Sequence, residues 1–146
     1  MTLIVVISLV ESMEVNRCRK KASGRIEKLE ITGCDSYPCK LKKNSKPTIN
    51  IKFKLRRRVN GLRLKIAGKL NGREIPFSVD DSHHCQNTIV NMPSKCILRK
   101  GSSYDYTFSL PILKEYPSLM VVVKYELVDK RGRPVLCFSF PAKIEE

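Results

Sequence analysis

The 146-residue sequence has no tryptophan, only two histidines, and 14 acidic residues against 28 lysines and arginines. It also lacks the motifs of the commonest catalytic sites, namely Gly-x-Ser-x-Gly, His-Glu-x-x-His and a glycine-rich phosphate loop. The adjacent carboxylates Asp80 and Asp81 diverge in an extended chain, so we interpret them as a solvated loop pair rather than an acid–base dyad. These absences argue against an enzyme, because a catalytic cysteine is disfavoured if all six are bridged and neither histidine has another plausible nucleophile near it.

Metal ligands are equally sparse. His83, His84 and Cys85 are adjacent, but no Cys-x-x-Cys pair and no spaced histidine pair accompanies them. We therefore expect no metal site, and we interpret both histidines as exposed loop residues. No recognition helix or aromatic platform motif is present, so nucleic acid is not an expected partner despite the basic charge.

No repeat, low-complexity tract or linker interrupts the chain, which predicts a single domain. Residues 2–10 (TLIVVISLV) are apolar and have the length of a signal peptide, although no lysine or arginine precedes them. The stretch is too short to span a bilayer. We predict a signal peptide over residues 1–12, removed after Ser12, and a mature domain over residues 13–146. The alternative is a buried first strand.

Six cysteines in so short a chain indicate three disulfides and an oxidising compartment. Cys34 and Cys39 are close enough to pair locally, and Cys85 and Cys96 bracket an irregular segment. That arrangement leaves Cys18 for Cys137. Other pairings remain open at this point, because the spacing of six cysteines does not fix their connectivity.

Apolar and polar residues alternate along most of the chain, which is typical of half-buried antiparallel strands. The alternation is clearest in residues 47–55 and recurs in residues 104–110 and 121–127. Asn60-Gly61 and Asn71-Gly72 indicate turns, a short strand is expected over residues 75–79, and residues 80–101 look irregular. About seven short strands without a convincing helix predict an all-β sandwich or barrel.

The segment PILKEYPS, residues 111–118, connects two of these strands and is unusually apolar for a loop. It places Ile112, Tyr116 and Pro117 together at the junction. We therefore expect this loop to cover an apolar space.

The formal net charge of +14 favours acidic partners such as anionic lipid or acidic glycan. If the strands that carry them paired, their outward basic residues would form one cationic face, able to dock on an anionic membrane or a microbial lipid. The alternative is a solvated face that prevents edge aggregation. The predicted basic face consists of Lys52, Lys54, Arg56, Arg63 and Lys65.

Several motifs together resemble the ML lipid-recognition family, in particular its Niemann-Pick type C-two (epididymal secretory) branch and its arthropod relatives. They are the six-cysteine order and the segments GCDSYPCKLKK, NGREIPF and LPILKEYPSLMVVVKYELVD, and the resemblance extends from Cys18 to Ile144. It implies an immunoglobulin-like sandwich of two antiparallel sheets with a hydrophobic cavity between them. It also implies the disulfides Cys18–Cys137, Cys34–Cys39 and Cys85–Cys96.

The resemblance further implies a secreted carrier of a sterol, fatty acid or similar lipid, acting as a monomer without a cofactor. Tyr116 would add a polar group at the mouth of the pocket. The chain departs from the sterol-transfer relatives at Tyr125 and Phe138, where they typically carry tryptophan. It also has no Asn-x-Ser/Thr sequon, so secretion is expected before lysosomal residence, the alternative compartment. The expected ligand-binding residues are Ile31, Phe53, Phe77, Ile112, Tyr116, Pro117, Val123, Tyr125 and Phe138.

Three further functions remain as alternatives. A cavity together with a basic face suits innate-immune recognition of anionic microbial lipids of the lipid A kind. The same cavity suits a carrier of semiochemicals. A filled core with the same charge suits a protein that binds polyanions at its surface only.

Overall fold

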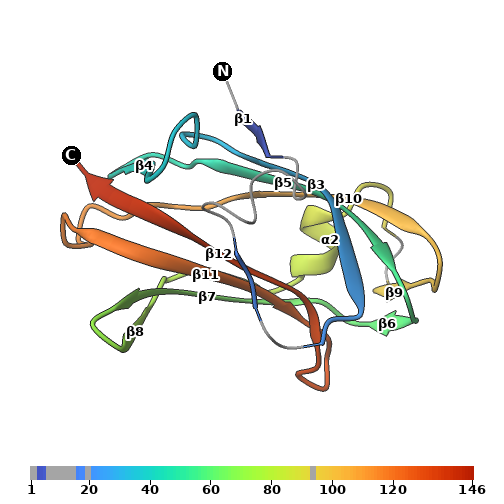
Figure 1. Ribbon diagram of the computed structural model, residues 1–146. Helices are drawn as coiled ribbons and strands as arrows, with labels where there is room; N and C mark the ends of the chain where they lie inside the picture. The colour runs from blue at the N-terminus through green and yellow to red at the C-terminus, as the bar shows by residue number, and fades with distance from the viewer. Residues whose placement is uncertain (1–2, 6–15, 19–20, 93–94) are drawn as a thin grey trace.

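The computed structural model describes residues 3–5, 16–18, 21–92 and 95–146, and its strands form two facing layers (Figure 1). The first sheet has the strand order β1-β3-β5-β10, and the second has the order β2-β12-β11-β7-β8, with β4 parallel to β12. A short third pair joins β6 to β9. The first sheet comprises β1 (Leu3–Val5), β3 (Gly24–Ile31), β5 (Thr48–Leu55) and β10 (Ser103–Ser109). The second comprises β2 (Asn16–Arg17), β4 (Cys39–Lys42), β7 (Arg63–Leu70), β8 (Arg73–Pro76), β11 (Met120–Val128) and β12 (Pro134–Glu145), and the short pair is β6 (Val59–Asn60) and β9 (Ile97–Leu98).

The predicted alternation sets the inner faces of both sheets, which confirms the antiparallel sandwich. Every second residue of β5 from Ile49 to Leu55 is buried, and the same holds for β11 from Val121 to Leu127 and β12 from Phe138 to Ile144. These side chains meet between the layers, as expected when two sheets share one core. The expected turn at Asn71-Gly72 is also confirmed, since both residues have positive φ and join β7 to β8 directly.

Two local predictions were wrong. The strand expected over residues 75–79 is β8, Arg73–Pro76, and beyond it only the Phe77 N–H continues the pairing, donating to the carbonyl of Ile66. The segment expected to be irregular contains a short helix, α2 (His84–Thr88), which contacts β10 of one sheet and β7 of the other. Figure 1 shows α2 between the two layers.

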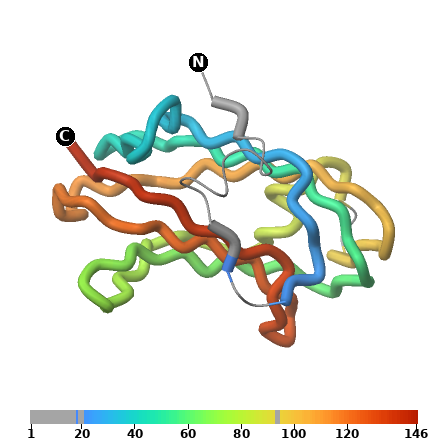
Figure 2. Tube along the Cα trace, viewed as in Figure 1, coloured from blue at the N-terminus to red at the C-terminus, as the bar shows by residue number. Residues whose placement is uncertain are grey.

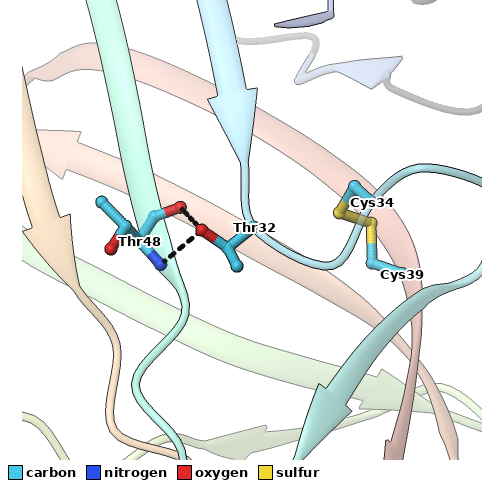
Figure 3. Close-up of a disulfide and its surroundings, with 4 residues drawn as sticks. All are labelled: Thr32, Cys34, Cys39 and Thr48. Carbon is cyan, nitrogen blue, oxygen red and sulfur yellow. Dashed lines mark hydrogen bonds between the residues drawn. A yellow bond between two sulfur atoms is a disulfide. The ribbon is translucent and has the colours of Figure 1, made fainter. Parts of the chain in front are cut away.

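The three disulfides are those that the family resemblance implied: Cys18–Cys137, Cys34–Cys39 and Cys85–Cys96. Cys34–Cys39 closes the loop between β3 and β4, beside Thr32 and Thr48, whose hydrogen bonds connect the end of β3 to the start of β5 (Figure 3). Cys85–Cys96 ties α2 to the segment that leads into β9. The described residues include no free cysteine.

The single basic face was a wrong prediction. Lys52 and Lys54 lie on β5, which pairs with β3 and β10, and Arg56 directly follows that strand. Arg63 and Lys65 lie on β7, which pairs with β11 and β8 in the other sheet. Because each strand turns its charged side outward, the two groups lie on opposite outer surfaces of the sandwich.

The signal peptide predicted over residues 1–12 is not tested by the structure. The backbone of β1 pairs antiparallel with β3, with Leu3 opposite Ile31. The predicted cleavage point after Ser12 lies outside the described residues, so the signal peptide stays a prediction. No helix among the described residues is long and apolar enough to cross a membrane.

Candidate functional site

An apolar pocket lies at the end of the sandwich where the β7–β8 hairpin, the loop before β11 and the C-terminal end of β12 come together. In Figure 2 these segments are the light-green hairpin, the orange loop and the red C-terminal strand. The cavity volume is only about 30 Å³, close to the space of one water molecule. We call it the entrance pocket; its lining residues are Gly68, Ile75, Pro76, Phe77, Tyr116, Pro117, Leu119, Val121 and Ile144.

Tyr116 closes this pocket from the loop side. Its ring meets the ring of Phe77 edge-on, with centroids 5.2 Å apart. The Ser78 N–H donates a hydrogen bond of 2.8 Å to Tyr116 Oη, so the hydroxyl predicted as a polar group of the mouth holds the loop against the segment that follows β8. The base of the loop is fixed separately, because the Ile112 N–H donates to the carbonyl of Ser45 at 2.9 Å.

Gly68 keeps the pocket floor open. A Cβ at this position would lie 3.4 Å from Val121 and 3.5 Å from Phe77, both of which are ordinary contacts. A methyl group therefore fits, whereas a longer side chain would fill the space between these two residues.

The remaining residues expected to bind ligand lie deeper and are packed together. The Tyr125 and Phe138 rings stack with centroids 5.2 Å apart. These are the two positions named above as departures from the tryptophan-containing relatives. Ile31, Ile112, Phe53 and Val123 are buried in the same core. Phe77, Tyr116 and Pro117 thus line the entrance, and the other six fill the interior.

A buried polar chain crosses this interior. His84 Nε2, on α2, lies 2.7 Å from Tyr106 Oη, on β10. Tyr106 Oη in turn bonds to Tyr125 Oη, on β11 of the opposite sheet. We call His84, Tyr106 and Tyr125 the polar chain. It connects α2, the first sheet and the second sheet through side-chain hydrogen bonds.

Burial keeps the polar chain uncharged at neutral pH. It lowers the pKa of His84 to about 4, although the nearby Asp81 carboxylate opposes this shift. Burial also raises the pKa of both tyrosines well above the usual value. The expectation that both histidines are exposed was wrong for His84, which is buried, and right for His83, which is exposed.

Sequence reasoning missed the polar chain because it counted Tyr106 and Tyr125 among the apolar inward residues. The available signal was that two hydroxyls had been assigned to the core, where each needs a hydrogen-bond partner. The partner, His84, lay in the segment that was expected to be irregular, among several other polar residues.

The larger hollows of the described surface are lined by both polar and apolar side chains. One of them, about 500 Å³, is lined in part by Lys65, Glu74, Asp81, Lys124 and Glu126. Within the described residues, no group of three or more His, Cys, Asp and Glu side chains could hold a metal ion.

Comparison with known proteins shows the family to which this chain belongs. The family model described as the ML domain matches residues 12–144. The chain belongs to the ML domain family. This ML domain is 35% identical over 136 residues to the NPC intracellular cholesterol transporter 2 homolog a of Drosophila melanogaster, covering 92% of this chain and 88% of that protein. It is 29% identical over 122 residues to the NPC intracellular cholesterol transporter 2 of Bos taurus, covering 84% and 78%.

A solved structure has the same architecture as this ML domain. The crystal structure of a Niemann-Pick type C2 protein from Japanese carpenter ant superposes with a TM-score of 0.76 at 24% identity, covering 88% of this chain and 97% of that one. At this identity the likeness concerns the fold. It confirms the sandwich expected from the alternating strands and from the resemblance.

Proposed function

We propose that this ML domain is a carrier that holds a sterol, a fatty acid or a similar lipid between its two sheets. The observation that carries the proposal is the entrance pocket. Apart from the hydroxyl of Tyr116, which Ser78 already occupies, every side chain that lines it is apolar. Transfer of a lipid from water into such surroundings is favourable by about 25 cal/mol per Å² of apolar surface removed from water.

The carrier must open to load its lipid. Binding sites for small molecules of this size usually have volumes of about 300–1,000 Å³, whereas the entrance pocket has about 30 Å³. A lipid therefore enters by separating the side chains of the two inner faces, beginning with Phe77 and Tyr116. The names of the relatives support the ligand class, since the Drosophila and Bos taurus proteins are described as cholesterol transporters.

A surface-only polyanion binder is the competing function, because a filled interior is what it predicts. The charge distribution argues against it. Lys52 and Lys54 lie on the outer side of one sheet and Arg63 and Lys65 on the outer side of the other, so the predicted residues do not combine into one strong patch. The same division argues against lipid A recognition through a single basic face.

Contact with an anionic membrane is proposed at the entrance end. Met120 and Val122 project outward at the start of β11 and are 48% and 43% exposed. Lys143 of β12 is the register partner of Met120, and Lys69 of β7 is that of Val122. Each lysine close to an anionic membrane contributes about 1 kcal/mol. Co-sedimentation with phosphatidylserine-containing vesicles should weaken for Met120→Ser with Lys143→Ser, and should stay unchanged for Lys52→Ser on the opposite surface.

The compartment and state of assembly are also part of the proposal. Three disulfides suit an oxidising environment, which supports secretion, with the lysosomal lumen as the alternative. The predicted removal of residues 1–12 and action as a monomer complete this picture. No bond chemistry is required for the carrier function.

Lipid extraction tests the proposal directly. The protein is purified with its disulfides intact, denatured, and extracted for mass spectrometry, and titrated in parallel with a fluorescent sterol and a fluorescent fatty acid. We expect a bound lipid or saturable binding of a probe. A protein that is empty and ignores both probes would reject the carrier and favour the polyanion binder.

Variants at Gly68 locate the site. The Gly68→Leu side chain fills the entrance pocket, so we expect at least about tenfold weaker probe binding. Gly68→Ala is the matched control, because its methyl group makes only ordinary contacts with Val121 and Phe77. Thermal unfolding of both variants shows whether a loss of binding reflects the pocket or the fold. Equal binding by both variants would place the entrance elsewhere.

A further inference from the structure

The end of the sandwich away from the entrance pocket is formed by the connections from β5 to β6, β9 to β10 and β11 to β12 (Figure 1). Each connection exposes basic side chains, and only Arg56 among them belonged to the predicted basic face. Residues 56–58, 99–101 and 130–132 contain no acidic and no apolar side chain. We call their cations the basic end; its residues are Arg56, Arg57, Arg58, Arg99, Lys100, Lys130 and Arg131.

Backbone hydrogen bonds hold the three connections of the basic end together. The Gly101 N–H donates to the carbonyl of Leu55 at 2.7 Å, so the turn between β9 and β10 lies against the end of β5. The Lys130 N–H donates to the carbonyl of Asn60 at 3.0 Å, which places the turn between β11 and β12 against β6. Residues 56–58 therefore connect the other two turns, and the seven cations share one end of the molecule.

The acidic residue of the third turn does not neutralise the basic end. Asp129 is buried, and its carboxylate accepts hydrogen bonds of 2.9 Å from the backbone N–H groups of Arg131 and Arg133. It also accepts one of 2.8 Å from Arg133 Nε, so its charge is offset by Arg133. No residue of the basic end forms an ion pair with a carboxylate of the part of the chain that the structure describes.

The composition of the basic end indicates which polyanion it fits. Five of its seven residues are arginines, whose planar guanidinium groups bind oxyanions through paired hydrogen bonds. Runs such as Arg56-Arg57-Arg58 are typical of patches that bind nucleic acid or heparin. The three turns offer no apolar side chain for insertion into a membrane, in contrast to Met120 and Val122 beside the entrance. Three disulfides suit an oxidising compartment, which favours an extracellular polysaccharide over nucleic acid.

We propose that the basic end is a docking surface for a sulfated polysaccharide. Such a chain carries negative groups at regular intervals, so it can contact all three turns at once and relieve the repulsion among the seven cations. This inference goes beyond the carrier function, because it requires neither an open pocket nor a bound lipid. Docking here leaves the entrance pocket, at the other end of the sandwich, uncovered.

One cation from each turn is removed to test the docking surface. Binding of a fluorescein-labelled heparin oligosaccharide is measured by fluorescence anisotropy at an ionic strength of about 0.15 M. We expect Arg58→Gln/Lys100→Gln/Lys130→Gln to bind about tenfold more weakly or worse than the wild type, because three exposed ionic contacts are lost together.

The matched control removes the same residue types, and the same charge, from exposed positions on other parts of the surface. It is Lys40→Gln/Lys65→Gln/Arg73→Gln, on β4, β7 and β8, and we expect a change below about twofold. Thermal unfolding of both triple variants checks the fold. If the first does not fold, Lys100→Gln/Lys130→Gln compared with Lys40→Gln/Lys65→Gln provides the same test.

Three outcomes would overturn the proposal. The wild type could ignore heparin, or both triple variants could lose affinity equally, which would mean that net charge alone attracts the polyanion. A single-stranded DNA oligonucleotide or phosphatidylserine-containing vesicles could also bind more tightly than heparin at equal concentrations of negative charge. We expect instead that heparin binds best and that its desulfated form binds much more weakly. Failure of the lipid probes would reject the carrier function and leave this assignment standing, so the two proposals fail separately.

Discussion

The entrance pocket and the polar chain lie only four residues apart on β11, at Val121 and Tyr125, yet different interactions hold them closed. The entrance is closed by apolar contact and by one hydrogen bond from the backbone of Ser78 to Tyr116. The interior is closed by side-chain hydrogen bonds that connect both sheets. Apolar contacts can be exchanged for contacts with a lipid at little cost, whereas buried hydrogen bonds must be replaced in kind. The comparison teaches that the entrance pocket can open at a smaller cost in free energy than the interior, where buried hydrogen bonds would be broken.

The largest expected effect comes from removing each tyrosine in turn. Tyr125→Ala deletes a fully buried ring stacked on Phe138 together with its hydrogen bond, and we expect the free energy of unfolding to fall by about 4 kcal/mol. Tyr116→Ala deletes a partly exposed ring, and about 1 kcal/mol is expected. Urea unfolding at pH 7 with the disulfides intact measures both values. Equal losses would contradict the distinction between a rigid interior and an adaptable entrance.

Acid should weaken the interior and leave the entrance unaffected. The pKa of His84 is about 4 in the folded protein and close to 6.5 in the unfolded chain, so the unfolded chain binds more protons between these values. The contribution of neutral His84 is complete above pH 6.5 and is lost as the pH falls from 6.5 towards 4. A difference of this size corresponds to about 3 kcal/mol. Unfolding measured across this range should therefore show decreasing stability towards low pH.

The two histidines provide the control for this titration. His84→Gln keeps a hydrogen-bonding side chain beside Tyr106 but cannot titrate, so we expect a clearly shallower pH dependence. His83→Gln changes an exposed neighbour and should reproduce the wild-type slope. A wild-type slope in the His84 variant would mean that other groups cause the acid sensitivity. In that case, lipid binding by Gly68→Ala, measured at pH 7 and pH 5, would show whether acid acts at the entrance pocket rather than at the polar chain.

The entrance could be predicted from the sequence and the polar chain could not, for a physical reason. Alternation assigns each residue of a strand to one of two faces, so the buried faces of β5, β11 and β12 followed directly. The apolar loop containing Ile112, Tyr116 and Pro117 was also visible, because loops normally carry polar residues. The polar chain depends on three residues far apart in sequence. Their meeting follows from how the two sheets face each other, which periodicity does not encode.

The same limit explains the error about the basic residues. Alternation correctly turns Lys52 and Lys65 outward, but it does not say which strands are neighbours. Strand pairing places β5 and β7 in different sheets, and the predicted face is divided between them. The helix α2 escaped notice because five residues are too few for a helical pattern, and its first turn has no acidic residue to indicate an N-terminus. Disulfide pairing was recovered because the family resemblance supplied what spacing left open.

The smallest expected effect on stability isolates the hydrogen bond that closes the entrance. Tyr116→Phe keeps the edge-on contact with Phe77 and removes only the acceptor for the Ser78 N–H, which is exposed enough to bond to water instead. We expect a loss below about 1 kcal/mol in the free energy of unfolding. The rates of lipid uptake and release should both rise several-fold while the affinity changes little, because the bond closes the path without contacting the deep part of the ligand. Stopped-flow fluorescence with a fatty acid probe measures these rates. Tyr125→Phe should leave the entry rate unchanged, because Tyr125 does not line the entrance pocket. A faster entry rate in that variant would show that the interior, rather than Tyr116, limits opening.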